Sequence, residues 1–310
     1  MIRTTLSLAI LLVACPVASG AIMFSPGHYY TVERSSRVIT QHSPAGEVVG
    51  SIDMGREVRG MAFGPDGLLY MTTVPRTGAG FDVRAVTEDG VVQVSYELRL
   101  PYGQDLPYMH GDDGYGTIAV DDKHIYVAGD GELTRFEIGE PDSGKIIYSG
   151  SYGTYVYDVK ILPDDGLLVA VRDDILELSP SGWVRRSVRS SSLRYSGVVG
   201  VEYNPDNSTV YVTQLNGKNL LSVDWEWGYV KESEYFSYAA DMFVTSSGDL
   251  LVGSRSENPR HYSADLELLG ELSTADHMFV TQYPVPEPSC LGPLITAALA
   301  FGFGSRQCSR

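Results

Sequence analysis

Short stretches in which apolar and polar residues alternate recur along the chain, with turn sequences between them. The segment 197–224 shows the unit most clearly, with runs and turns at Val199–Tyr203, Asn204–Asn207, Val210–Thr213 and Leu220–Asp224. A strand, a turn, a second strand, a loop and a third strand in this order are typical of an antiparallel meander. No window of region 24–283 has a sustained helical stripe with caps, so the pattern predicts an all-β protein.

The unit returns at a nearly fixed period. Equivalent positions of its first strand are Phe63, Val120, Ile161, Tyr203 and Val244, which are 57, 41, 42 and 41 residues apart. A four-stranded propeller blade takes about 40–45 residues. The one long interval contains an insertion, Pro101–Tyr115, which is rich in Tyr, Pro, Gly and Asp. Each unit is therefore predicted to form one blade.

The two ends of the repeat region are incomplete in complementary ways. Three strands without a first strand are predicted at Tyr29–Glu33, Arg37–Gln41 and Glu47–Ile52, whereas the strand His277–Thr281 has no meander after it. If the last strand completes the first blade, the ring closes without an open sheet edge. We therefore predict a six-bladed β-propeller over residues 24–284, closed by its C-terminal strand, with seven blades as the alternative.

One repeat also carries a family motif. The runs Val210–Thr213 and Leu221–Asp224 together resemble a YVTN repeat, with Gln214 where that family usually has Asn. As a pattern, the resemblance to bacterial propellers of the NHL and YVTN type extends over most of the chain. It implies the fold and little about activity, because one fold supports many functions.

Charge and cysteine content narrow the range of partners. The chain has a formal charge of −16, and the body without residues 1–20 and 285–310 has 38 acidic against 20 basic residues. Such a surface argues against binding to nucleic acid or to an anionic membrane, both of which require basic patches.

The three cysteines, Cys15, Cys290 and Cys308, all lie outside the repeats, so the propeller has neither a disulfide nor a cysteine zinc site.

The N-terminus has the features of an export signal. Arg3 is followed by the apolar run Leu6–Val13 and by small residues at Ala18–Ala21, which predicts a signal peptide over residues 1–20. The run is too short to span a bilayer. Alternatively, Leu12–Cys15 resembles a bacterial lipobox, in which Cys15 would be lipidated.

The C-terminus carries the most specific motif. Val285, Pro286, Glu287 and Pro288 precede the apolar run Cys290–Gly304 and two terminal arginines. Residues 285–310 resemble a PEP-CTERM sorting tail. This resemblance implies recognition by an exosortase-type enzyme and a place at the cell surface or in the extracellular polysaccharide matrix of a Gram-negative bacterium. The run of 15 residues reaches about 22 Å as a helix, short of a roughly 30 Å hydrocarbon core, so we expect only transient membrane contact.

Candidate chemistry lies where the first strands begin, because these strands line the central channel of a propeller. Asp158, Asp241, Asp276 and His277 are predicted to face the channel, where carboxylate oxygens could hold a divalent cation such as Ca²⁺. The alternative is that these acidic side chains accept hydrogen bonds from neighbouring backbone. No established cofactor or catalytic motif is present.

The insertion is the second candidate site. Its residues Tyr108, His110, Asp112 and Asp113 are predicted to form an acidic, aromatic loop over the channel mouth, where a ligand would be held. A solvated surface loop is the alternative interpretation. The pair Trp225 and Trp227 would suit sugar rings if exposed, but blade packing explains these residues as well.

Two functions remain open at this point. The first is a non-catalytic binding or scaffolding protein whose ligand is a saccharide or a matrix protein. The second is a metal-dependent lactonase or hydrolase that resembles gluconolactonase-type propellers, in which a Glu, an Asn and an Asp hold a channel metal. That ligand set has no clear counterpart, because Asn204 falls in a turn and Glu202 lies inside a strand.

Overall fold

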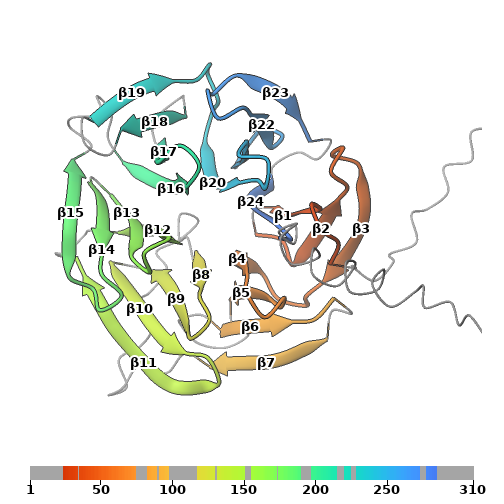
Figure 1. The fold of residues 1–310 in the computed structure, drawn as a ribbon. Helices are drawn as coiled ribbons and strands as arrows, with labels where there is room; N and C mark the ends of the chain where they lie inside the picture. The colour runs from red at the N-terminus through yellow and green to blue at the C-terminus, as the bar shows by residue number, and fades with distance from the viewer. Residues whose placement is uncertain are drawn as a thin grey trace, which may run out of the picture.

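The computed structural model describes residues 24–284 with gaps at 34, 75–81, 89–90, 98–116, 130, 151–154, 173, 190–196, 215–219, 225–227 and 273–276. Within these residues the chain forms strands and no helix, so no segment there is a helix long and apolar enough to cross a membrane. The strands form six antiparallel sheets of four strands each, arranged as a ring (Figure 1). The predicted six-bladed propeller is confirmed, and seven blades are excluded for the described chain.

In five blades the strands follow the chain from the centre of the ring outward, and in blade 1 the last strand of the chain takes the innermost place (Figure 1). Blade 1 consists of β24 (His277–Gln282), β1 (Tyr29–Glu33), β2 (Val38–His42) and β3 (Val48–Asp53). Blade 2 consists of β4 (Val58–Phe63), β5 (Leu69–Thr73), β6 (Asp82–Val86) and β7 (Val92–Glu97). Blade 3 consists of β8 (Ile118–Val120), β9 (His124–Gly129), β10 (Glu132–Glu137) and β11 (Glu140–Ser149).

The remaining blades repeat this order. Blade 4 consists of β12 (Val156–Ile161), β13 (Leu167–Val171), β14 (Asp174–Leu178) and β15 (Val184–Arg189). Blade 5 consists of β16 (Val198–Asn204), β17 (Thr209–Gln214), β18 (Leu221–Asp224) and β19 (Gly228–Glu232). Blade 6 consists of β20 (Ala239–Val244), β21 (Leu250–Ser254), β22 (Arg260–Tyr262) and β23 (Leu268–Glu271). All five predicted first-strand positions lie in the innermost strands, and two of the three predicted N-terminal strands begin one residue later than expected.

The ring closes through the C-terminal strand, as predicted. Strand β24 pairs antiparallel with β1, and Thr31 lies opposite Val280 in this ladder. Blade 1 is therefore built from both ends of the described chain, which leaves no open edge between the first and last blades.

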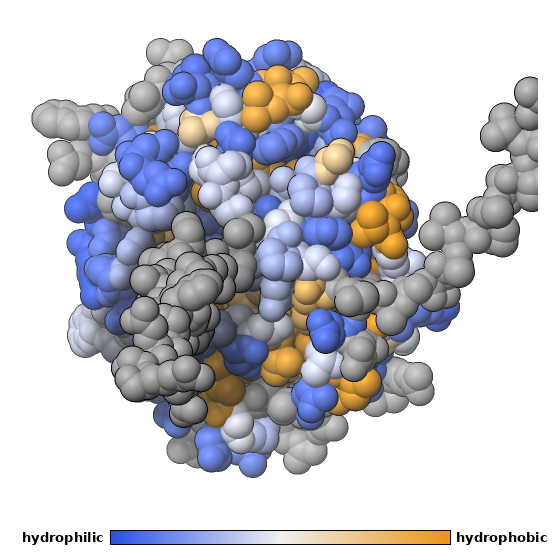
Figure 2. Space-filling view, turned by 45° about the vertical axis from the view of Figure 1, so that its right-hand side comes forward, coloured by the Kyte–Doolittle hydropathy of each residue, from blue (hydrophilic) through white to orange (hydrophobic). Residues whose placement is uncertain are grey.

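The core consists of apolar side chains between neighbouring blades. The second strands β5, β13 and β21 are buried at every residue, because both faces of each blade pack against another blade. These strands are accordingly mostly apolar instead of alternating with polar residues, and their polar residues Thr72, Thr73 and Ser254 are buried as well. The outermost strands face water, and the surface in view is mostly hydrophilic, with apolar residues in several separate groups (Figure 2).

Close backbone contact seats the closing strand on blade 6. Gly253 in β21 lies against β24, and a Cβ atom at this position would be 2.3 Å from the carbonyl oxygen of Met278 and 2.9 Å from that of His277. Backbone oxygens cannot rotate away as a flexible side chain can. Only glycine therefore allows β24 to approach blade 6 this closely.

We expect Gly253→Ala to lower the free energy of unfolding by about 1–3 kcal/mol, because the added methyl group must displace the closing strand. Gly270→Ala is the matched control, since nothing lies within 4 Å of its Cβ position, and we expect it to change stability by less than about 0.5 kcal/mol. Urea unfolding followed by tryptophan fluorescence measures both. Equal stability of the two variants would contradict the packing described for β24.

Candidate functional site in the central channel

A single lysine joins three blades at the centre of the ring. Asp158 and Lys160 lie two residues apart on β12, and therefore on the same face of that strand. The Lys160 Nζ atom is 3.0 Å from Asp241 Oδ1 on β20, and it is 3.6 Å from Glu202 Oε2 on β16 and 3.9 Å from Asp158 Oδ2. It also donates a hydrogen bond of 3.0 Å to the carbonyl oxygen of Met242. One ammonium thus contacts carboxylates from blades 4, 5 and 6.

The two channel aspartates also bind backbone of the next blade. Asp158 accepts a hydrogen bond of 2.8 Å from the amide of Val159 and one of 3.0 Å from the amide of Val201 in blade 5. Asp241 accepts bonds from Met242 in its own strand and from Val280 in blade 1, at 2.9 and 3.1 Å. The alternative interpretation from the sequence, that these residues bond neighbouring backbone, describes both of them.

Threonines make the same kind of link elsewhere in the ring. Thr117, which is equivalent to Asp158, donates a hydrogen bond of 3.0 Å from its hydroxyl to the carbonyl oxygen of Tyr157 in blade 4. Thr213 donates one of 2.7 Å to the carbonyl oxygen of Ala240 in blade 6. Polar side chains near the channel therefore connect one blade to the next.

Burial raises the pKa values of two carboxyl groups in this cluster toward neutral pH. Asp158 is 1% exposed, and burial, opposed by Lys160 and reinforced by Asp241, raises its pKa to about 7. Burial likewise raises the pKa of Glu202 to about 7, although Lys160 lowers it. For Lys160 burial acts to lower the pKa, but Asp158, Asp241 and Glu202 together raise it above its ordinary value. The lysine is therefore charged, whereas Asp158 and Glu202 exchange protons near neutral pH.

His277 occupies a different position from the aspartates. It is 8% exposed, and its Nδ1 atom makes a hydrogen bond with the hydroxyl of Thr31, which also bonds His42 Nε2 at 2.8 Å. Burial, together with the nearby His42, lowers the pKa of His277 to about 4. This neutral histidine links the closing strand to β1 and β2 within blade 1.

The metal hypothesis for Asp158, Asp241, Asp276 and His277 stays a prediction. Asp276 is not among the described residues. Within the described part of the chain, no group of three or more His, Cys, Asp or Glu side chains is arranged to hold a metal ion.

Several other predicted features fall on parts of the chain that the structure does not describe. These are Tyr108, His110, Asp112 and Asp113 of the insertion, the pair Trp225 and Trp227, Cys15 and the signal segment, and the tail with Val285, Pro286, Glu287 and Pro288. They stay predictions.

Lys160 and Glu202 are site residues that were missed from the sequence. They occupy equivalent positions of neighbouring blades, one residue before Ile161 and Tyr203. The corresponding residues of blades 2, 3 and 6 are Ala62, Ala119 and Phe243. The available signal was a charged residue at a position that is apolar in blades 2, 3 and 6.

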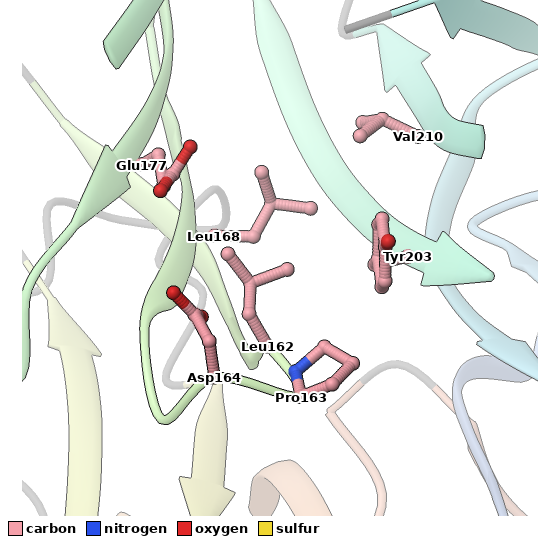
Figure 3. Close-up of a pocket in the computed structure, with 7 residues that line it drawn as sticks. All are labelled: Leu162, Pro163, Asp164, Leu168, Glu177, Tyr203 and Val210. Atoms are coloured by element: carbon pink, nitrogen blue, oxygen red, sulfur yellow. The ribbon is translucent and has the colours of Figure 1, made fainter. Parts of the chain in front are cut away.

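A pocket of about 230 Å³ lies between blades 4 and 5 (Figure 3). Seven residues line it: Leu162, Pro163, Asp164, Leu168, Glu177, Tyr203 and Val210. Arg185 on β15 pairs with Asp164 at 2.6 Å and lies 3.8 Å from Glu177. The pocket thus has an apolar floor and a rim that combines acidic side chains with a guanidinium.

The chain is a six-bladed β-propeller, and the solved structures that resemble it include virginiamycin B lyase. No family model and no curated protein matches the sequence. Virginiamycin B lyase from Staphylococcus aureus aligns with 13% identity and a TM-score of 0.55, over 82% of this chain and 84% of the lyase.

Two further solved structures show the same architecture. A protein of unknown function from Bacteroides caccae aligns with 13% identity and a TM-score of 0.57, over 83% of this chain and 98% of that one. A chain of a nidogen/laminin complex aligns with 10% identity and a TM-score of 0.63, over 82% and 97%. At these identities the likeness establishes the fold alone.

We expect Lys160→Met to lower the free energy of unfolding by about 3–5 kcal/mol at pH 8, because it leaves three buried carboxylates without their cation. The loss should be smaller at pH 5, where Asp158 and Glu202, with folded pKa values of about 7, are protonated. Lys145→Met, at an exposed position of β11, is the control. A loss that does not change between pH 5 and 8 would show that the carboxylates are not coupled to Lys160.

The wild-type protein should also lose stability as pH rises from about 4 to about 7. The folded pKa values of Asp158 and Glu202 lie above their ordinary values, so the folded state binds more protons in this window. His277 has the opposite effect on stability. Because its pKa is lowered in the folded protein, it increases the free energy of unfolding as the pH rises from about 4 to 6.5. Equilibrium unfolding of the double variant Asp158→Asn with Glu202→Gln across this pH range isolates the contribution of the two carboxyl groups. The free energy of unfolding of this variant should not fall as the pH rises.

Proposed function

We propose that this protein is an exported β-propeller of the cell envelope or extracellular matrix that acts by binding or scaffolding and not by catalysis. The observation that carries the proposal is the ammonium of Lys160, which lies among the channel carboxylates Asp158, Glu202 and Asp241. The charges most suited to chemistry in the channel thereby serve to hold blades 4, 5 and 6 together.

The same observation counts against the rival function. A metal-dependent lactonase or hydrolase would need carboxylate oxygens free to approach a cation such as Ca²⁺ to about 2.3–2.6 Å. Here a fixed positive charge is already 3.0 Å from Asp241, and both aspartates accept backbone hydrogen bonds from neighbouring blades. A divalent ion would have to displace Lys160 and break those bonds.

Export and sorting rest on the two ends of the sequence. The signal segment 1–20 and the PEP-CTERM-like tail 285–310 together favour recognition by an exosortase-type enzyme and a place at the surface of a Gram-negative bacterium.

The acidic body suits a neutral, hydroxyl-rich saccharide or a matrix protein better than an anionic partner. Exposed aromatic side chains such as Trp183, at 79% exposed, can stack on the apolar face of a sugar ring.

A metal titration distinguishes the binding role from the hydrolase. We expect isothermal titration of the purified protein with Ca²⁺ to show no stoichiometric uptake, because the ammonium of Lys160 already occupies the space among the channel carboxylates. Uptake of one ion per chain that disappears in Asp158→Asn with Asp241→Asn would overturn the proposal in favour of the metal-dependent enzyme. Asp53→Asn, at an exposed end of β3, is the control for nonspecific binding.

The sorting proposal has its own test. Deletion of residues 285–310 should move the protein from the cell surface to the medium or the periplasm, as followed by fractionation and immunoblotting. Replacement of Pro286, Glu287 and Pro288 by alanine should have the same effect while leaving the apolar run intact. An unchanged distribution of both variants would remove the tail from the proposal.

A further inference from the structure

A buried tyrosine recurs at one position of the repeat. The residue is Tyr70 in β5, Tyr126 in β9 and Tyr211 in β17, and each ring is at most 1% exposed. The hydroxyl of Tyr70 donates to Asp66 at 2.8 Å, and that of Tyr126 donates to Asp121 at 3.1 Å. In blades 2 and 3, an aspartate at the turn before the second strand therefore accepts the hydroxyl hydrogen.

The ring fills the space between its own blade and the next. Tyr70 belongs to one buried cluster with Val120 and Ile125 of blade 3. The other two tyrosines pack with the corresponding residues of their next blade. Tyr126 shares a cluster with Ile161 and Leu167, and Tyr211 shares one with Val244 and Leu250. Two residues of the following blade thus form one wall of each tyrosine site.

Blade 4 lacks this tyrosine. The equivalent residue is Leu168, and the pocket between blades 4 and 5 lies beside it (Figure 3). The wall from the next blade is again present, as Tyr203 and Val210, and Asp164 stands four residues before Leu168 as Asp66 stands before Tyr70. The pocket therefore retains both the wall and the aspartate of a tyrosine site, without the tyrosine.

Part of the space is taken by another substitution. Gly64 lies under the ring of Tyr70, since a Cβ atom there would be 2.7 Å from the ring. The equivalent residue of blade 4 is Leu162, which forms part of the pocket floor. The remaining volume of about 230 Å³ is still larger than the roughly 150 Å³ apolar cavity that is known to accept benzene.

We propose that this pocket binds a phenolic ring, with its hydroxyl directed at the acidic rim and its ring on Tyr203, Leu162 and Leu168. Asp164 accepts hydrogen bonds from the amide of Gly166 at 3.0 Å and from Arg185 at 2.6 Å, which leaves lone pairs for a further donor. The rim combines two carboxylates, Asp164 and Glu177, with one guanidinium, Arg185, so its remaining negative charge disfavours an anion and a neutral ring is preferred. A phenol is neutral at pH 7, since its pKa is about 10.

This site deepens the proposed binding function but does not depend on the sorting tail or on the channel. A phenolic ring can come from a tyrosine side chain of a partner polypeptide or from a free phenol. Failure to bind phenols would remove this site alone, whereas the tail deletion and the Ca²⁺ titration test the proposed function separately.

The experiment titrates the purified full-length protein with p-cresol and with toluene, which lacks the hydroxyl, and follows leucine methyl groups by NMR. We expect p-cresol to shift the methyl signals of Leu162 and Leu168 and to bind about tenfold more tightly than toluene, which corresponds to one hydrogen bond to a charged acceptor. N-acetyl-tyrosinamide distinguishes the sources: if it binds like p-cresol, the site accepts a partner's tyrosine, and if only p-cresol binds, the ligand is a free phenol.

Two variants make the test specific. Leu162→Gly with Leu168→Tyr rebuilds the pair found in blade 2, and the new ring should reduce p-cresol binding more than tenfold. Asp164→Ala, whose side chain is largely exposed, should keep the fold and abolish the preference for p-cresol over toluene. Equal binding of p-cresol and toluene by the wild-type protein, or no binding of either, would overturn the proposal.

Discussion

The pairing of β24 with β1 is the constraint on which the rest of the structure depends. Each blade is apolar on both faces, so no blade is stable unless a neighbour covers each face. In an open array of six blades, the first and the last would each expose one apolar face. Closure through His277–Gln282 removes both exposed faces, and the chain meets this requirement by building blade 1 from its two distant ends.

The polar contacts near the channel follow from closure. Six first strands converge around the centre, and polar side chains lie on or beside them. Asp158, Asp241, Thr117 and Thr213 bond backbone groups of the next blade, so that these buried polar atoms are satisfied. Lys160 balances part of the negative charge that this arrangement brings together, which explains why a lysine stands on β12 two residues from Asp158.

The sequence was sufficient to predict the fold because the repeat is encoded locally. Turns and alternating residues marked the first strands at Phe63, Val120 and Ile161, and the two incomplete ends identified the closing strand. The partners of Lys160 could not be predicted in the same way, because they lie on three different blades and meet only through the curvature of the ring. Glu202 was set aside for lying inside a strand, yet that position is the one from which its side chain reaches Lys160.

Blades 4 and 5 differ from blades 2 and 3 at several positions of the repeat. Where blades 2, 3 and 6 have Ala62, Ala119 and Phe243, blades 4 and 5 have Lys160 and Glu202. Where Tyr70 fills the space beside blade 3, Leu168 leaves a pocket beside blade 5. Each departure costs stability relative to the repeat, since a buried charge must be paired and an unfilled space loses packing contacts. The charge pairs of Lys160 link blades 4, 5 and 6, whereas the pocket adds nothing to the packing, so the pocket is the departure that folding alone does not explain.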